Sequence, residues 1–395
     1  MCVEVRILIY SDFAYRRHEG GIYAEQPFAI FLTTLAGLVQ HVTLVGRLDP
    51  ADEPWHFPLP PTVGYLALPY YGHAFNPLAV LAATAGSASR FWRALAQADT
   101  ALLFGPSPLA VVFAVLALLR GRQVALGVRQ DYVSYVRSRH PGRRWLHLAA
   151  GVLDACFRLL ARRCSVIAVG PAQSQRYARA RRLLPLSVTL IGEADVVAGP
   201  RVTGGTGSDL VVLSVGRLDN EKNPLLLADV LAELRSRDER WRLTVCGDGP
   251  LRAPLRERLR ELGVDHHATL RGFVPMGPSL LDIYRTSDMF LHTSRTEGSP
   301  QVLFEAFAAG LPVVATDVGG VAAAADGAAL VIPPDNPSAA AAALARLAKD
   351  GELRDQLVSA GLLIARRHTR ELQCRRLVDF LLDASTRSPA ARGPS

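Results

Sequence analysis

Short apolar runs alternate with longer stretches of helical periodicity along this chain. In the first half, five such runs predict buried strands: Val3–Tyr10, Val42–Val45, Ala101–Phe104, Val124–Leu126 and Val166–Val169. A second series follows at Leu210–Val215, Leu243–Cys246, Ala268–Leu270, Met289–Leu291 and Val313–Ala315. Because strands that alternate with helices form parallel, doubly wound sheets, the pattern predicts an α/β protein with two similar halves.

Glycine and proline mark the expected domain boundaries. The stretch 197–208 contains several glycines and a proline and cannot hold a helix or strand, so it predicts a linker. An N-terminal half, 1–196, would precede the linker. In this half the first strand and a glycine loop would be followed by a helix from about Tyr23 to Val39. After about Ala339 only helical patterns remain, and 385–395 has the composition of a disordered tail.

Composition adds limits on the class of protein. The chain has 395 residues, of which 49% are hydrophobic and 20% charged, as in ordinary globular proteins. Its start, Met1–Arg6, carries charges where a signal peptide needs an apolar run, and the run Pro108–Leu119 is too short to span a bilayer. Five cysteines show no paired or ligand spacing. We therefore expect a cytoplasmic protein with reduced thiols.

The net charge of +8 comes almost wholly from arginine, since Lys222 and Lys349 are the only lysines among 44 basic residues. A basic balance suits nucleic acid, anionic lipid or phosphorylated substrates. No nucleic-acid-binding motif is present, so nucleic acid is the weakest of these. An apolar helix from Trp145 to Leu160, with arginines at both ends, suggests peripheral contact with the inner membrane face. Because apolar residues occur on most sides of this helix, the sequence favours a buried helix with solvated ends over a membrane-surface helix.

Two glutamates, Glu297 and Glu305, flank seven residues in the most informative stretch of the chain. Ser299 is the expected N-cap and Pro300 the expected first residue of a helix that stops at Gly310. Glu305 is the single charge in this apolar helix, and a buried carboxylate needs a partner. The vicinal hydroxyls of a ligand would satisfy it, as would an arginine in a structural salt bridge.

Positive charge follows the expected strand Leu210–Val215, at Arg217 and Lys222. Ligands of open α/β sheets bind beyond the carboxyl ends of strands. An arginine fork and a lysine at that place suit a diphosphate, although a solvated lysine is the ordinary alternative.

These motifs resemble glycosyltransferase family 4, the retaining enzymes of the GT-B fold. The resemblance covers roughly 208–320: a Gly-Arg-Leu turn at Gly216, a lysine five residues after the arginine, a Gly-Asp-Gly-Pro turn at Gly247 and the paired glutamates. It implies two Rossmann-like domains that face each other across a cleft. Residues 1–196 would bind the acceptor and 209–368 the nucleotide sugar, while a helix over 369–384 would cross back to the first domain.

The resemblance also implies roles for the residues of the second half. Arg217 and Lys222 would neutralise the leaving diphosphate, Glu297 would hold the transferred sugar, and Glu305 would hold the ribose. Together with Glu297, the two cations form the implied catalytic set. The implied donor-binding set is Glu305 with Gly20, Gly21, Gly216, Phe273, Val274, Gly298, Ser299 and Pro300. Of these, Phe273 and Val274 would meet the base, and Gly298 would let the donor approach the backbone closely.

The first half is less informative. His18, Gly20 and Gly21 match the family's glycine loop, which approaches the phosphates and the acceptor. Where the family commonly has an acceptor-side histidine, this chain has Arg129 and Asp131. We therefore take His18, Arg129 and Asp131 as acceptor-side candidates, while Asp131 could equally be a helix N-cap.

The function implied by this resemblance is retaining transfer of a sugar from a UDP- or GDP-sugar to a hydroxyl acceptor. A saccharide, a lipid-linked glycan or a small metabolite would serve as acceptor. No metal or other cofactor is expected, because the two cations supply the positive charge. A GT-B phosphorylase or isomerase and a non-catalytic nucleotide-sugar-binding protein are the alternatives, since a fold does not determine a function.

Overall fold

The computed structural model describes residues 3–70, 77–129, 131–139, 142–200, 209–298 and 300–385. Ser299, the core of the expected linker (201–208) and the expected tail beyond Ser385 lie outside these ranges. The chain divides into two compact units, Met1–Val188 with Glu371–Ser395, and Thr189–Arg370. The first boundary therefore falls after Val188 rather than at 196. The start of the expected linker belongs to the second unit, where the Val197 amide donates to the Ala308 carbonyl at 2.9 Å.

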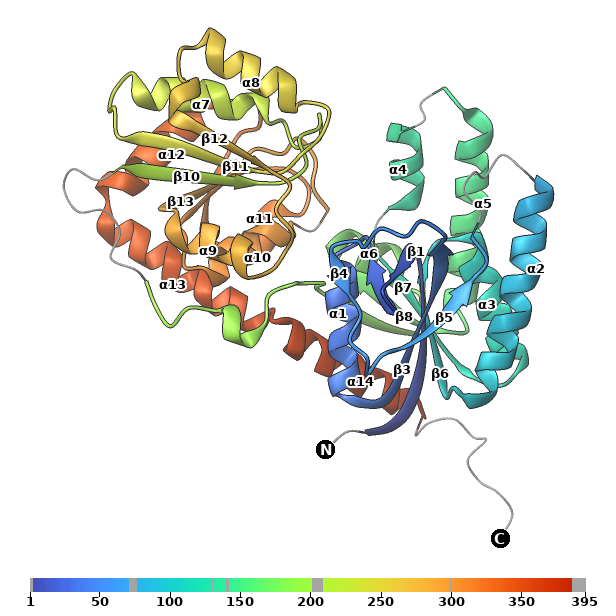
Figure 1. The fold of residues 1–395 in the computed structure, drawn as a ribbon. Coiled ribbons are helices and arrows are strands. Elements are labelled where there is room, and N and C mark those ends of the chain that lie inside the picture. Colours follow the sequence, from blue (N-terminus) through green and yellow to red (C-terminus); the bar gives the residue numbers. More distant parts are fainter. Residues whose placement is uncertain are drawn as a thin grey trace. The chain divides into compact units, whose positions relative to one another are not determined.

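The first unit is built on a sheet whose parallel strands run in the order β5-β3-β1-β6-β7-β8-β9 (Figure 1). Two short strands, β2 and β4, add antiparallel pairing beside β1. The strands are β1 (Val3–His18), β2 (Gly21–Ala24), β3 (Val39–Asp49), β4 (Phe57–Pro58), β5 (Gly64–Leu68), β6 (Thr100–Gly105), β7 (Gln123–Val128), β8 (Ser165–Val169) and β9 (Arg182–Leu186). The helices are α1 (Phe28–Thr34), α2 (Pro77–Ala94), α3 (Pro108–Leu119), α4 (Tyr132–Arg139), α5 (Arg144–Ala161), α6 (Pro171–Arg176) and α14 (Arg370–Ser385).

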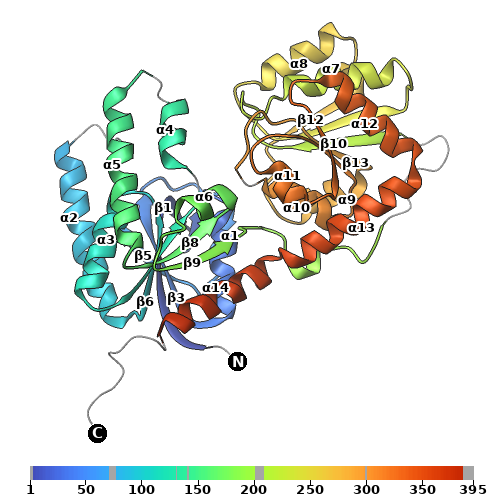
Figure 2. The same cartoon turned by 180° about the vertical axis from the view of Figure 1, so that it is seen from behind.

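Helices cover both faces of this sheet. On one face Phe91 of α2 stacks on Phe113 of α3 at 4.0 Å between centroids, and Phe157 of α5 completes the cluster. On the other face α14 packs beside α1, where the Cys374 thiol lies 3.5 Å from the Phe31 carbonyl (Figure 2). The C-terminal helix thus belongs to the first unit although it follows the second in sequence.

The second unit has a six-stranded, all-parallel sheet in the order β12-β11-β10-β13-β14-β15. Its strands are β10 (Leu210–Val215), β11 (Trp241–Cys246), β12 (Ala268–Gly272), β13 (Met289–His292), β14 (Val313–Thr316) and β15 (Ala329–Ile332). Its helices are α7 (Leu225–Arg235), α8 (Arg252–Glu261), α9 (Pro278–Thr286), α10 (Gln301–Ala308), α11 (Val321–Ala325), α12 (Pro337–Lys349) and α13 (Gly351–Arg367). Helices α7, α8 and α12 bury one face of the sheet, and α9, α10 and α11 bury the other (Figure 1). Helix α13 contributes side chains to both core clusters.

The expected α/β class and the parallel, doubly wound sheets are therefore confirmed. The start of the chain differs from expectation, because β1 continues to His18 instead of ending at Tyr10. Beyond that point it pairs with β2 and with the end of β3, with a register shift after Tyr10. The helix expected from Tyr23 is accordingly the strand β2 followed by the shorter α1.

The expectation that the helix around Trp145–Leu160 is buried is wrong. Helix α5 buries only a narrow stripe, whereas Trp145, Leu148, Val152 and Leu159 are 61%, 72%, 56% and 64% exposed. The helix packs on the sheet through its small residues and Phe157, which leaves the larger apolar side chains on the opposite face. Within the described residues, no helix is long and apolar enough to cross a membrane.

Candidate active site

The candidate site of the second unit lies at the carboxyl edge of its sheet. Strand β10 is paired with β11 on one side and with β13 on the other, so the connections after β10 and β13 leave in opposite directions. Ligands of open α/β sheets bind at such a topological switch point. The Gly-Arg-Leu turn follows β10 and the segment with Glu297 follows β13. The topology therefore places the predicted cations and the first glutamate in neighbouring loops.

The loop after β10 is held by backbone hydrogen bonds. The Leu218 amide donates to the Asp248 carbonyl at 2.9 Å, and the Leu251 amide donates to the Leu218 carbonyl at 2.8 Å. A β-carbon at Gly247, whose φ is +153°, would lie 1.8 Å from the Gly216 carbonyl oxygen. The Gly-Asp-Gly-Pro turn thus supports the Gly-Arg-Leu turn from behind, and only glycine fits at that contact.

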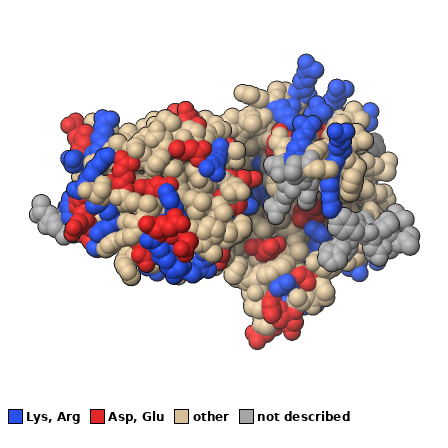
Figure 3. All heavy atoms as spheres, turned by 90° about the horizontal axis from the view of Figure 1, so that it is seen from above, with Lys and Arg blue, Asp and Glu red and all other residues tan. Residues whose placement is uncertain are grey.

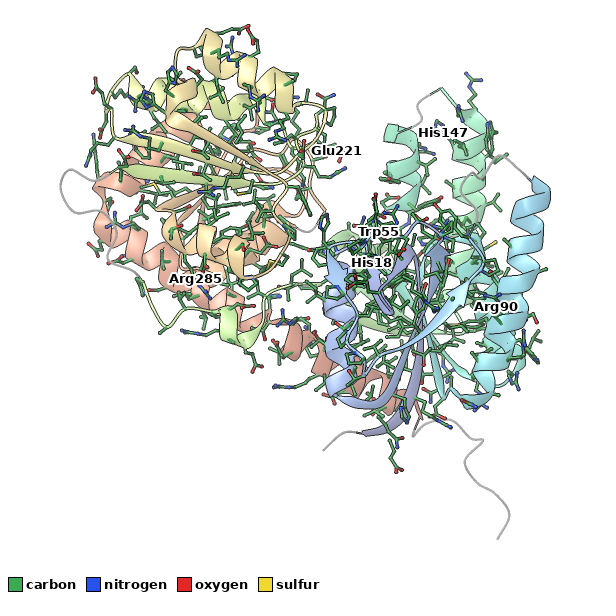
Figure 4. The ribbon with its side chains drawn as sticks, viewed as in Figure 1. His18, Trp55, Arg90, His147, Glu221 and Arg285 are labelled. Carbon is green, nitrogen blue, oxygen red and sulfur yellow. The ribbon has the colours of Figure 1, made fainter. Side chains whose placement is uncertain are left out.

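Arg217 and Lys222 occupy different environments in this loop. The Arg217 side chain is 61% exposed and pairs with Asp219 and with Glu221, each at 3.1 Å. Figure 4 marks Glu221 at this edge of the second unit. Lys222 is mostly buried, and its ammonium group contacts Glu297. Arg217 is therefore available to a ligand from the solvent, whereas Lys222 is fixed against a carboxylate.

Glu297 lies between two basic side chains. Its Oε2 atom contacts Lys222 Nζ and lies 3.4 Å from His292 Nε2. Burial alone would raise the pKa of Glu297, but the hydrogen bond from His292 and the charge of Lys222 outweigh it and lower the pKa to about 2. Glu297 is consequently ionised at neutral pH and can only accept hydrogen bonds.

The sequence analysis missed His292. It is the last residue of β13, is 4% exposed, and also lies 3.0 Å from the Ser294 hydroxyl. Its Nδ1 atom is buried and finds no hydrogen-bond partner among the described residues. A single histidine in an apolar strand matches no spacing motif, so its contact with Glu297 could be seen only once the loop after β13 was placed.

The loop that carries Glu297 packs tightly against two glycines after β14. A β-carbon at Gly319, whose φ is +53°, would lie 1.9 Å from the Glu297 carbonyl oxygen, and one at Gly320 would lie 2.3 Å from that of Gly298. The Gly320 amide also donates to the Glu297 carbonyl at 3.1 Å. At Gly298 itself a β-carbon would meet no described atom within 4 Å. If position 298 requires glycine, the reason would therefore be a bound ligand that leaves no space for a side chain.

Glu305 lies inside α10 and is buried, as predicted. Neither an arginine nor another cation pairs with it among the described residues. Instead the Tyr284 hydroxyl of α9 donates to its Oε2 atom at 2.8 Å. Burial raises the pKa of Glu305 to about 7, because its effect is larger than the lowering effect of the Tyr284 hydrogen bond. The salt-bridge alternative is therefore wrong, because the second carboxylate has a neutral partner.

Helix α10 starts one residue later than expected. Pro300 is the N-cap residue, with φ −76° and ψ 94°, and Gln301 is the first helical residue. The expected cap Ser299 lies outside the described residues. The helix ends as predicted, with Gly310 at φ +70° just beyond it.

The residues expected to meet the base follow β12 at the same edge of the sheet. Phe273 is a largely exposed aromatic residue, whereas Val274 packs partly against the core. An exposed aromatic ring at the carboxyl end of a strand is compatible with stacking on a planar ligand.

The three glycine-loop residues of the first unit belong to a hairpin. His18 pairs with Gly21 across a turn in which Glu19 and Gly20 have φ of +47° and +80°. The His18 ring lies 3.2 Å from Asp52, and the hairpin also holds Arg16 over the Trp55 ring at 4.4 Å (Figure 4). The glycine loop expected between the first strand and a helix is therefore the turn of the hairpin between β1 and β2.

Arg129 and Asp131, after β7, have separate local roles. Asp131 accepts hydrogen bonds from the amides of Val133 and Ser134 and pairs with Arg176 at 3.2 Å. It is thus the N-cap of α4, as its alternative interpretation predicts. Arg129 stacks on Phe28, with its guanidinium carbon 3.9 Å from the ring centroid.

Within the described ranges, no three His, Cys, Asp or Glu side chains gather as a metal site would require. The candidate chemistry of the second unit therefore consists of two cations, two carboxylates in contrasting environments, and one buried histidine.

Comparisons with known proteins show which sequences and folds this chain is similar to. Over 208 residues the chain is 36% identical to D-inositol 3-phosphate glycosyltransferase from Saccharomonospora viridis, which covers 49% of this chain and 47% of the relative. It is 38% identical over 120 residues to mannosylfructose-phosphate synthase from Agrobacterium fabrum, which covers 28% of this chain and 26% of the relative. The chain thus spans about half the length, or less, of these curated relatives.

Solved structures match nearly the whole chain. Sucrose-phosphate synthase from Thermosynechococcus elongatus has a TM-score of 0.71 at 18% identity and covers 98% of this chain and 100% of its own. HepE from Anabaena, in complex with UDP, has a TM-score of 0.68 at 16% identity, with coverage of 96% and 100%. Residues 201–362 match the model of the family described as glycosyl transferases group 1. The chain therefore has the fold of GT-B glycosyltransferases, and its second unit contains a glycosyl transferases group 1 domain.

Proposed function

We propose that this protein is a retaining glycosyltransferase that moves a sugar from a UDP- or GDP-sugar to a hydroxyl acceptor. The observation that carries the proposal is the contact of Lys222 with Glu297, beside Arg217, at the switch point of the group 1 domain. Structures of HepE with UDP and with UDP-glucose support a uridine nucleotide as the first donor to test. A phosphorylase, an isomerase and a non-catalytic binding protein are the alternatives.

The charges of the site suit departure of a nucleoside diphosphate. Arg217 offers an exposed guanidinium fork, and Lys222 is held in place by Glu297 before any ligand arrives. Fixed positive charge at the position where negative charge develops is an effective form of catalysis, because little reorganisation is needed during the reaction. We therefore propose that transfer proceeds without a divalent cation.

The two glutamates would hold the donor rather than exchange protons with it. Glu297 is ionised well below neutral pH and would accept hydrogen bonds from the hydroxyls of the transferred sugar. Glu305 would accept hydrogen bonds from the ribose. With no carboxylate assigned as a nucleophile, the acceptor would attack from the side of the leaving diphosphate and would retain the anomeric configuration.

Product analysis tests the reaction itself. With an α-linked nucleotide sugar and a panel of hydroxyl acceptors, we expect an α-glycoside in the proton NMR spectrum of fresh product, with undiminished activity in excess chelator. A β-linked product contradicts retention, and activity that chelator abolishes and manganese restores contradicts metal independence. Release of sugar 1-phosphate that depends on inorganic phosphate would identify a phosphorylase.

Removal of either cation should slow turnover. For Arg217→Ala and Lys222→Ala we expect a loss of about 10²-fold or more in kcat, as for other charge-stabilising groups. Arg217 is exposed, so its loss should leave the melting temperature unchanged. Lys222→Ala strands the ionised Glu297 and should cost about 1–2 kcal/mol of stability, a cost that disappears as pH falls from 4.5 toward 2.

Lys349→Ala is the matched control, since it removes the other lysine of the chain at the end of α12. It should leave both turnover and melting temperature unchanged. Near-normal turnover in Arg217→Ala and Lys222→Ala together would show that the diphosphate does not bind at this loop.

Glu305→Gln should separate binding from stability. The folded state keeps a proton on Glu305 that the unfolded state loses, so stability falls as pH rises from 4.5 to about 7. The variant lacks this penalty and can still accept the Tyr284 hydrogen bond. We expect it to be more stable than wild type at pH 8 by on the order of 2 kcal/mol, and equal to it near pH 4.5.

Calorimetry of the same variant should show weaker donor binding, because the amide replaces a charged acceptor by a neutral one. Glu352→Gln, at an exposed carboxylate of α13, is the control for both measurements. Equal donor affinity with a lower melting temperature at pH 8 would mean that the carboxylate is structural.

We also propose that α5 contacts an anionic bilayer surface. Its four exposed apolar residues share one face, and arginines at 143, 144, 158, 162 and 163 flank them. The single acid of the helix, Asp154, is buried against Arg158 and Arg176. Figure 3 shows basic side chains gathered on one part of the first unit and acidic ones on another. An apolar face bordered by arginines suits phospholipids of negative charge.

Sedimentation with vesicles tests this contact. We expect the protein to bind phosphatidylglycerol-containing vesicles in a salt-dependent manner and to bind phosphatidylcholine vesicles weakly. The double variant Trp145→Ser, Leu148→Ser should lose about tenfold or more in affinity, whereas Trp92→Ser, at an exposed tryptophan of α2, should not. Equal binding of all three proteins would exclude α5 as the contact.

A further inference from the structure

A cavity of about 430 Å³ lies in the first unit where β1 separates from β6. Its lining includes Asp12 and Phe13 of β1, residues 104–106 at the end of β6, and Arg129 just after β7. Strand β1 pairs with β3 on one side and with β6 on the other, so the cavity occupies the switch point of the first sheet. Open α/β sheets bind ligands at this place, and the volume is that of a small-molecule pocket.

Arg129 is an unusual residue in the lining of this cavity. Its guanidinium lies over two aromatic rings, 3.9 Å from the Phe28 centroid and 5.4 Å from that of Phe13. Within the described part of the chain, Arg129 makes no side-chain hydrogen bond, and no carboxylate oxygen lies within 4 Å of its nitrogens. None of these nitrogens is sealed from the solvent. Stacking fixes the plane of the guanidinium and leaves its N–H donors free for a ligand.

The other charges near the cavity already have partners. Asp12, the acid of the lining, pairs with Arg47 at 3.3 Å and accepts a hydrogen bond from the Tyr10 hydroxyl. Asp131 caps α4 and pairs with Arg176. Burial lowers the pKa of Arg129 to about 10, which still leaves it charged at neutral pH. The cavity thus contains one positive charge that no described group of the protein compensates, and such a charge is costly unless a ligand pairs with it.

We propose that this cavity is an acceptor subsite for an anionic group, a phosphate or a carboxylate, and that Arg129 binds this group. A planar fork of N–H donors fits two oxygens of either anion, so the preferred acceptor carries a negative charge. Tyr132 and Tyr135, also on the cavity wall, place aromatic surface beside a sugar ring. The inference rests on the proposed glycosyl transfer in one respect: that reaction is the reason why the bound anion is called the acceptor.

Calorimetry on the full chain tests the proposal without turnover. The probes are inorganic phosphate, glucose 6-phosphate, glucuronate and uncharged glucose, and UDP is titrated in parallel. We expect wild type to bind the three anions more tightly than glucose. Arg129→Met keeps an apolar contact with the rings and should lower the affinity for the anions about tenfold or more, while Arg129→Lys should fall between. The UDP affinity should be equal in all variants.

Arg120→Met is the matched control, because Arg120 also lies over an aromatic ring, that of Trp92 at 4.7 Å, outside the cavity. It should bind every probe as wild type does. Absence of saturable anion binding in wild type, or unchanged anion affinity in Arg129→Met, would overturn the proposal. A parallel loss of UDP and phosphate would also overturn it, by assigning the cavity to the donor. If the proposed transfer alone is wrong, UDP binding and turnover fail while the Arg129-dependent anion binding persists.

Discussion

The contact between the loops that follow β10 and β13 is the constraint on which the candidate donor site depends. The two strands are neighbours in the sheet although their loops are far apart in sequence. The Thr293 hydroxyl donates to the Lys222 carbonyl at 3.0 Å, and the Arg295 amide donates to the Glu221 carbonyl at 2.8 Å. These bonds hold the loops together, and the charge pair of Lys222 with Glu297 follows from them.

The two glutamates show how the surroundings shift the pKa of identical side chains in opposite directions. Glu297 has a cation and a histidine beside it, so its pKa falls to about 2, whereas Glu305 has a tyrosine hydroxyl and apolar surroundings, so its pKa rises to about 7. Separation of two pKa values in one site is a frequent sign of distinct roles. In the free protein Glu297 is ionised and held by its two basic neighbours, while ionisation of Glu305 carries the cost of burial.

The many arginines do not serve one purpose. Arg217 is exposed beside two carboxylates, and Arg176 holds the buried Asp154. Arg129 lies on aromatic rings and has no acidic partner among the described residues. A net charge of +8 therefore says little about ligands until each guanidinium is placed. Arg129 is the informative one, because no acidic group in the described part of the chain pairs with its charge.

The sequence by itself determined the two α/β halves, the buried strands and the burial of Glu305, because hydrophobic periodicity and helix-stop signals act over a few residues. It also made Arg217, Lys222 and Glu297 candidate site residues, through the family motifs that they resemble. Only the tertiary structure decided what these residues touch. The hairpin at Gly20, the exposed face of α5, the contact of His292 with Glu297 and the Tyr284 partner of Glu305 all depend on pairing between distant segments. Such pairing is set by strand order and packing, which local patterns do not encode.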